Sequence, residues 1–461
     1  MKAFLKSVID GLAVDYADIR AEEAERTGIR YRGRDLDEMD RSFERGGCLR
    51  VFHKGNWVVS TFNNLDDSLV ELATEMAARV ERLAASPGMI APLGPHDETV
   101  PVPLSPEADA GTLDPRKVPL AEKHALIRHY NDIMLAADGI ATTISRYQDA
   151  HREVAFLSSD DRYISQQFVD TGFSCTAVAR DGTDIQTYSD SFGKPLGFAA
   201  LKDREPVVER IARVALDLLK AEPVEAGTWP VIIDPLLAGV FAHEAFGHLS
   251  EADQVAENEQ LRRLMKLGSR FGVDELTIVD DATMLGERGS YRYDDEGASA
   301  ERTELIRHGI LVERLHNRQT AQQLNEPPTG NARALSYRFP PIVRMSNTYI
   351  EPRSALLDDM LESMERGLYV VGSRGGMTEL ESFTFSAQYA RLVEHGRLTR
   401  MVRNVTLSGN VFETMKNIDM IGDDLTMFGG TGGCGKDGQS PLPVGLGAPH
   451  ISIKGVVIGG R

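Results

Sequence analysis

The sequence is poor in cysteine, has no excess of positive charge, and contains no hydrophobic run long enough to span a membrane. Its 3 cysteines among 461 residues, at positions 48, 175 and 434, are too few and too scattered for a disulfide framework. With 51 Lys and Arg against 69 Asp and Glu, the formal net charge is -18, which repels nucleic-acid phosphates. The first ten residues include Lys6 and Asp10 and do not resemble a signal peptide. We therefore expect a cytoplasmic protein that binds neither nucleic acid nor membranes.

The N-terminal half combines strand and helix patterns. A content of 42% hydrophobic residues can supply a large core. Strand-like runs flank Lys54-Gly55-Asn56 and Asp181-Gly182, which predicts two hairpins. Apolar residues at intervals of three and four predict three amphipathic helices, over residues 69–83, 126–134 and 207–219.

A break after the last of these helices marks the main domain boundary. Ala221-Glu222-Pro223 ends the helical pattern, and short strand-like runs with glycine turns dominate beyond it, with one short helix expected near residues 356–364. We therefore predict an α+β fold. Residues 1–222 should form an N-terminal mixed α/β domain, and residues 223–461 a C-terminal, mostly antiparallel β domain that contains a metal-binding helix.

That metal-binding helix is predicted from one short motif. Residues 243 to 248 are His-Glu-Ala-Phe-Gly-His, close to the His-Glu-x-x-His of zinc hydrolases, in which two imidazoles on one helical face reach a single ion. Here the histidines are five residues apart, so in a regular α-helix their side chains would point about 140° apart. We expect either a π-type turn that closes this spacing or a helix that ends at Gly247. Upstream, Asp234-Pro235 predicts a capped helix start.

A catalytic zinc site needs a third protein ligand. The candidates are Glu251, Asp253, His450 and Cys434. Cys434 lies in Gly429–Gly438, where six of ten residues are glycine, and a lone thiol in so adaptable a segment is the best candidate, with an inert buried cysteine as the alternative. The two acidic residues suit groups that orient an imidazole. Cys48 and Cys175 fall on predicted strands and should belong to the core.

The same glycine segment imitates a phosphate-binding loop. Gly430, Gly435 and Lys436 have the spacing of a P-loop, but Asp437 stands where that loop has its magnesium-binding hydroxyl. No strand-and-helix pattern surrounds the segment, so we expect no nucleotide site there.

Taken together, these motifs resemble the TldD/PmbA family, and in particular its TldD-type zinc metallopeptidases. The resemblance rests on the hexapeptide, on Gly432–Gln439, on Gly330-Asn331-Ala332-Arg333 and on Gly46–Val51, so it spans most of the chain. It implies a cytoplasmic peptidase. The residues after the hexapeptide, Leu249–Asp253, depart from the pattern of some members, so their substrate preference is not transferred to this chain.

The resemblance also implies roles for individual residues and a kind of partner. It implies that His243, His248 and Cys434 bind Zn²⁺ and that Glu244 serves catalysis. Members of the family act on unfolded peptides or small unstable proteins, including peptide-antibiotic precursors and antitoxins. Many pair with a PmbA-like paralogue that lacks the metal motif, which implies a homodimer or such a heterodimer here.

The expected reaction is zinc-assisted hydrolysis of a peptide bond. Zinc would lower the pKa of a water molecule from about 15.7 towards roughly 7, and Glu244 would take the proton and return it to the leaving amine. Strand edges in an antiparallel domain would let an extended peptide bind by adding a strand beside the metal. Two other classes fit the same motif: a zinc amidase acting on small molecules, and a non-catalytic regulatory protein with a closed structural zinc site.

Overall fold

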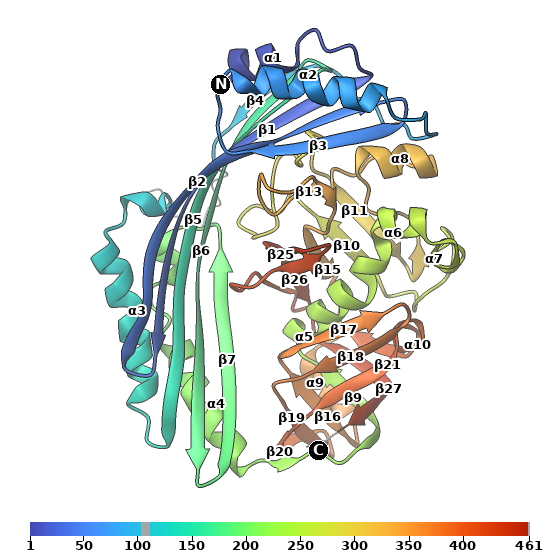
Figure 1. Cartoon of the computed structure of the whole chain (residues 1–461). Helices are drawn as coiled ribbons and strands as arrows, with labels where there is room; N and C mark the ends of the chain where they lie inside the picture. Colours follow the sequence, from blue (N-terminus) through green and yellow to red (C-terminus); the bar gives the residue numbers. More distant parts are fainter. Residues whose placement is uncertain (103–110, 460–461) are drawn as a thin grey trace.

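Four long strands dominate the N-terminal part of the protein (Figure 1). The computed structural model describes residues 1–102 and 111–459. The first sheet has seven strands in the order β3-β2-β1-β5-β6-β4, with β7 paired to β6. Both predicted hairpins are confirmed, since β2 turns into β3 at Lys54-Gly55 and β6 turns into β7 at Gly182. The strands are β1 (Tyr16–Arg32), β2 (Asp35–His53), β3 (Asn56–Phe62), β4 (His96–Val100), β5 (Ile140–Ser158), β6 (Arg162–Asp181) and β7 (Asp184–Lys194).

Each end of this sheet is covered by its own pair of helices (Figure 1). Helices α1 (Lys2–Ile9) and α2 (Ser68–Glu81) bury one apolar cluster against the sheet, and α3 (Leu120–Leu135) and α4 (Glu205–Lys220) bury another. The three amphipathic helices predicted from the sequence are thus confirmed as α2, α3 and α4. One continuous sheet connects the two clusters, which gives the N-terminal region its mixed α/β character.

The C-terminal part contains two larger sheets of mixed pairing. Most neighbouring strands are antiparallel, but β9 and β16, β15 and β26, and β20 and β8 run parallel. The predicted boundary at residue 222 falls within β8 (Glu222–Pro223). The ten-stranded sheet contains, in order, β17 (Gly375–Glu379), β18 (Ser382–Ser386), β21 (Thr406–Asn410), β27 (Ile451–Gly459), β9 (Gly227–Ile233), β16 (Arg366–Val371), β19 (Tyr389–Glu394), β20 (Arg397–Arg403) and β8, with β22 (Ile418–Ile421) paired to β27. The six-stranded sheet contains β12 (Ile310–Leu311), β11 (Arg302–Arg307), β10 (Ile278–Asp281), β15 (Asn347–Ile350), β26 (Gly445–Ala448) and β23 (Thr426–Phe428).

The C-terminal part also has more short helices than the single one predicted. The expected helix near residues 356–364 is confirmed as α9, but the prediction of only one was wrong. Helices of six or seven residues span fewer than two turns, so their apolar residues show too little of the 3.6-residue period to be recognised in the sequence. These helices are α6 (Ala252–Glu257), α7 (Glu259–Leu264), α8 (Arg318–Leu324), α9 (Leu357–Glu362) and α10 (Val411–Lys416).

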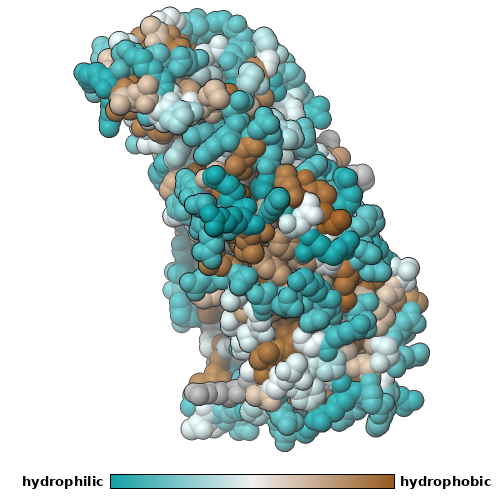
Figure 2. Space-filling view, turned by 90° about the vertical axis from the view of Figure 1, so that its right-hand side faces the viewer, coloured by the Kyte–Doolittle hydropathy of each residue, from teal (hydrophilic) through white to brown (hydrophobic). Residues whose placement is uncertain are grey.

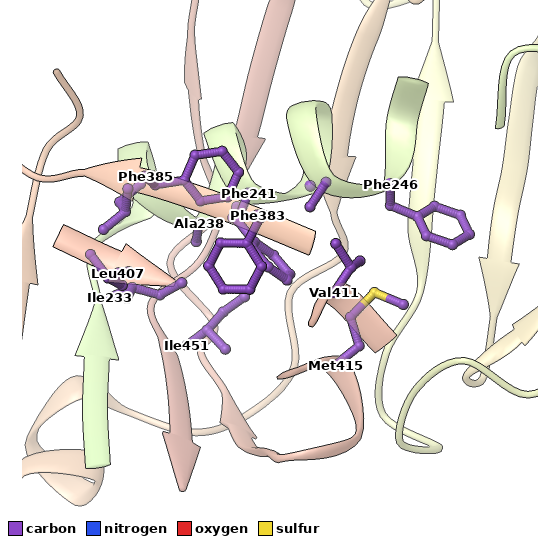
Figure 3. Packing of buried hydrophobic residues seen from close by; sticks show 14 of the residues in the cluster. Ile233, Ala238, Phe241, Phe246, Phe383, Phe385, Leu407, Val411, Met415 and Ile451 are labelled. Atoms are coloured by element: carbon purple, nitrogen blue, oxygen red, sulfur yellow. The ribbon is translucent and has the colours of Figure 1, made fainter. Parts of the chain in front are cut away.

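The helix that leads to the hexapeptide is part of the C-terminal core. It begins as α5 (Pro235–Val240), where the side chain of Asp234 accepts a hydrogen bond from the amide of Leu237, as the sequence predicts. The ring of Phe241 meets Phe383 edge-on at 5.5 Å between centroids, within a cluster of buried apolar side chains (Figure 3). This packing fixes the helix, and with it the direction of the polar residues that follow.

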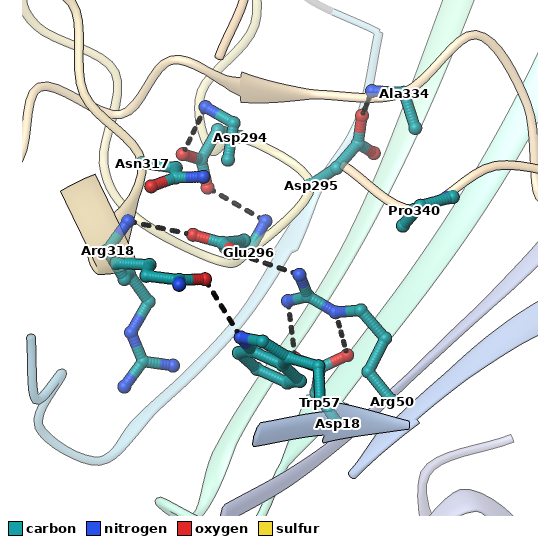
Figure 4. Close-up of polar contacts among 12 residues, drawn as sticks. Asp18, Arg50, Trp57, Asp294, Asp295, Glu296, Asn317, Arg318, Ala334 and Pro340 are labelled. Carbon is teal, nitrogen blue, oxygen red and sulfur yellow. Dashed lines mark hydrogen bonds and ion pairs between the residues drawn. The ribbon is translucent and has the colours of Figure 1, made fainter. Parts of the chain in front are cut away.

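Buried charges join the two parts of the molecule (Figure 4). Arg50 on β2 donates to both oxygens of Asp18, at 3.0 and 2.6 Å, and reaches Glu296 of the C-terminal part at 2.8 Å. All three side chains are at most 5% exposed. Nearby, the indole of Trp57 donates to Gln319 at 3.0 Å. Arg50 thus pairs with acids of both parts at a contact that excludes solvent, and these directional bonds fix how the two parts dock.

The surface shows no large apolar face in the view of Figure 2, where hydrophobic residues gather in separate patches among hydrophilic ones. Within the described part of the chain, no helix is long and apolar enough to cross a membrane.

Candidate metal centre

The first five residues of the hexapeptide lie on a π-helical segment, η3 (Phe241–Gly247), that continues α5, and His248 follows directly after it. The amide of His248 donates to the carbonyl of His243, a hydrogen bond that spans five residues instead of four. Residues five apart therefore become neighbours, and the two imidazole rings lie 5.4 Å apart between centroids. A Cβ at Gly247 would fall 2.0 Å from the sulfur of Met345, so only glycine fits there as packed. Of the two predicted alternatives, the π turn is confirmed.

The structure brings the three predicted metal ligands together. One donor atom from each of His243, His248 and Cys434 lies within 4.8 Å of the others. The sulfur of Cys434, on strand β24 (Cys434–Lys436), is 3.3 Å from Nε2 of His248. Two donors bonded to one tetrahedral ion at about 2.0–2.3 Å would be separated by roughly 3.3–3.8 Å. The spacing of these donors therefore suits a shared ion.

The other three candidate ligands occupy different positions. Glu251 accepts from Nδ1 of His248 at 3.0 Å, on the side of the ring away from Cys434. Asp253 accepts from Nζ of Lys436, and His450 makes its hydrogen bonds outside the centre. Because Glu251 accepts this hydrogen bond at Nδ1, it orients the imidazole so that Nε2 faces Cys434, the orienting role that the sequence predicts.

Lys436 completes this support for the imidazole. Its ammonium lies 3.1 Å from the fully buried carboxylate of Glu251 and 2.7 Å from both oxygens of Asp253. These carboxylates raise the pKa of Lys436 despite its burial. The lysine of the apparent P-loop therefore pairs with two buried acids. This role of Lys436 was not predicted from the sequence, although the acidic pair after the hexapeptide was a signal for it, since buried carboxylates need a cation.

The electrostatics of the centre favour a metal-binding thiolate. Burial raises the pKa of Cys434, but the two motif imidazoles outweigh it and lower the pKa to about 4. Burial lowers the pKa of His248, but Glu251 and Cys434 raise it to about 11. Cys48 and Cys175 lie buried on β2 and β6, as predicted, and burial raises the pKa of both thiols. Of the three cysteines, only Cys434 is therefore held as a thiolate, the form of cysteine that binds metal ions.

These residues fit a metal ion with one coordination position left open. Nδ1 of His243 is buried and has no hydrogen-bond partner among the described residues, so a bound species would satisfy it. Glu244 extends beside the donors without joining them, with Oε2 3.8 Å from Nε2 of His248 and its side chain 34% exposed. Two imidazoles and a thiolate with an acid beside the open side match the donor set of catalytic zinc sites.

Comparison with known proteins identifies relatives over most of the chain. Models of the PmbA/TldA metallopeptidase family match as domain 1 (residues 17–86), central domain (113–219) and C-terminal domain (226–460). A metalloprotease of Synechocystis sp. is 42% identical over 97% of this chain and 95% of its own length. A zinc metalloprotease TldD homolog of Saccharolobus solfataricus is 30% identical over 97% of each chain.

Solved structures share the fold at lower identity. TldE from Thermococcus kodakarensis superimposes with a TM-score of 0.77 at 17% identity, over 97% of each chain. A Thermotoga maritima protein superimposes with a TM-score of 0.80 at 18% identity, over 99% of each chain. The long sheet and the C-terminal sheets are therefore an architecture that distant relatives retain.

Proposed function

Because the chain belongs to the PmbA/TldD metallopeptidase family, we propose that it hydrolyses peptide bonds in unfolded peptides or small unstable proteins, with Zn²⁺ held by His243, His248 and Cys434. The observation that supports this most is the convergence of two imidazoles and a thiolate within 4.8 Å, with an acid beside them. When held by these residues, Zn²⁺ would polarise a carbonyl and lower the pKa of a water molecule towards roughly 7.

Glu244 is the proposed general base and acid. It is adjacent in sequence to one proposed ligand and approaches the imidazole of the other at 3.8 Å, so it lies within reach of a water molecule beside the metal. As a carboxylate it takes the proton of that water, and as a carboxylic acid it returns the proton to the leaving amine. Its partial exposure leaves room for substrate on the same side.

A free strand edge beside the hexapeptide supports a peptide as the substrate. β17 is the terminal strand of the ten-stranded sheet and packs against η3, and its Met377 side chain is 70% exposed. An extended peptide would pair with this edge through backbone hydrogen bonds, which read conformation instead of sequence. A small-molecule amide gains nothing from a strand edge, and a closed structural zinc site would not leave an acid beside an open position. Both observations favour a peptidase over the two alternatives.

Removal of the metal tests the proposed function. We expect chelator-treated protein to lose hydrolysis of an unstructured peptide library and stoichiometric Zn²⁺ to restore it, measured by mass spectrometry of the products together with elemental analysis. A folded domain that contains a cleaved sequence should resist the zinc-loaded protein. Cleavage of small amides without cleavage of peptides would instead favour an amidase, and bound zinc without hydrolysis a regulatory protein.

We also propose that the chain functions as a dimer, with itself or with a PmbA-like paralogue. Residues 35–43 of β2 pair with β1 but with no other described strand, and Phe43 in this stretch is 62% exposed. A long free edge with apolar side chains favours pairing with another chain. By analytical ultracentrifugation, with or without the paralogue, we expect a wild-type dimer and a Phe43→Asp variant that is largely monomeric. Leu285→Asp, which changes a side chain that is 61% exposed elsewhere, should leave the dimer intact.

A further inference from the structure

The glycine segment that leads to Cys434 rests on the N-terminal sheet. A Cβ added to Gly193 on β7 would fall 1.7 Å from the carbonyl oxygen of Gly430, so the two backbones touch with no room for a side chain. Beside this contact, Gln148 on β5 donates to the carbonyl of Thr431 at 3.2 Å. The N-terminal sheet supplies none of the proposed metal ligands, but it supports the glycine segment that contains Cys434.

A buried arginine links the glycine segment to the N-terminal sheet. Arg288 donates from Nε and Nη2 to the two oxygens of Asp170 on β6, at 2.8 and 2.6 Å. Its Nη1 donates to the carbonyls of Gly432 and, at 3.5 Å, Gly429. The side chain of Arg288 is 5% exposed, so solvent screens this pairing little. A planar guanidinium that is hydrogen-bonded on both sides can adopt only one orientation. The Arg288 side chain therefore fixes the backbone at Gly432, two residues before Cys434.

We propose that Arg288 and Asp170 are positioning residues for the thiolate of Cys434, so that the N-terminal sheet sets the metal affinity of a site in the C-terminal domain. The inference rests on the proposed zinc site and adds a determinant of its affinity. A segment rich in glycine loses much conformational entropy when it is ordered. The Arg288–Asp170 pair and the contact with the N-terminal sheet order the glycine segment before the metal binds. Metal binding then costs less conformational entropy.

The test measures metal binding directly. Zinc affinity is determined by competition with a chromogenic chelator, and cobalt is substituted to record the absorption band that arises from its bond to sulfur. Groups that support a metal ligand typically contribute 10–100-fold to affinity. We expect Asp170→Asn to weaken zinc binding about 10-fold and Arg288→Met about 10–100-fold, with a weaker or shifted cobalt–sulfur band. The double variant should bind no more weakly than Arg288→Met alone, because both substitutions release the same contact.

A second ion pair between the same two parts of the molecule provides a matched control. Asp184 at the start of β7 accepts from Arg403 on β20 at 2.7 Å, and both side chains make their bonds outside the glycine segment. Asp184→Asn should leave zinc affinity and the cobalt spectrum unchanged, with circular dichroism confirming that every variant is folded.

Three outcomes would overturn the inference. Wild-type affinity and spectrum in folded Asp170→Asn and Arg288→Met would show that the pair does not position the thiolate. An equal loss in Asp184→Asn would show that general docking of the two parts matters instead of this contact. A wild-type protein that binds neither ion would overturn the proposed function as well, so the failure of the inference alone is distinguishable from the failure of both.

Discussion

The Glu244→Gln variant is expected to retain its zinc and to lose peptide hydrolysis by a factor of about 10²–10⁴, the usual contribution of a general acid or base. Glutamine has the size of glutamate but cannot accept the proton of a water molecule at neutral pH. Zinc should stay bound because Glu244 is not one of the three converging donors. The measurements are kcat on an unstructured peptide and the zinc content of the same sample.

A neighbouring glutamate provides the control for this substitution. Glu257 is exposed at the end of α6, and Glu257→Gln should leave both kcat and zinc content unchanged. Near wild-type hydrolysis by Glu244→Gln would refute the proposed acid–base role. Loss of zinc from that variant would instead show that the carboxylate binds the metal, which is a different mechanism.

Those parts of the fold that depend on local chemistry were predictable from the sequence. The hairpins at Gly55 and Gly182 follow from glycines at positive φ, and the start of α5 follows from the Asp234 cap. Two histidines five residues apart cannot share an ion on an α-helix, so the sequence predicted either a π turn or a helix that ends at Gly247, and the structure has the π turn. The parallel pairing of β9 with β16 was not predictable, because strands more than a hundred residues apart leave no local signal of which neighbour they choose.

The same distinction applies to the site. His243, Glu244 and His248 are a contiguous motif, and Cys434 was selected because a lone thiol among glycines is unusual. Their arrangement also needs residues whose partners are distant in sequence. Lys436 supports Glu251 across 185 positions, and Arg288 meets Asp170 across 118. Lysines, arginines and acids are abundant in this chain, so only the folded structure shows which of them pair.

Gly193→Ala is expected to lower kcat/KM for peptide hydrolysis by about 100-fold, although Gly193 lies in the N-terminal sheet. The new methyl group would start 1.7 Å from the Gly430 carbonyl oxygen, against an ordinary contact of about 3.5 Å, so the glycine segment or the strand must move by more than ~1 Å. A displacement of about 1 Å in a catalytic group costs on the order of 10²-fold, and overpacking costs a further ~1–3 kcal/mol of stability. Kinetics, the cobalt–sulfur band and thermal unfolding measure these effects.

Gly432→Ala separates this effect from a general need for glycine near Cys434. A Cβ at Gly432 meets no atom within 4 Å, and its φ lies outside the left-handed region, so alanine fits there without strain. We expect this variant to retain near wild-type kinetics and cobalt absorption, although it lies only two residues from the proposed ligand. If Gly432→Ala were the damaging change and Gly193→Ala the harmless one, local flexibility of the segment would govern the site. With the expected order, the contact with the distant sheet governs it, because the variant that preserves that contact keeps its activity.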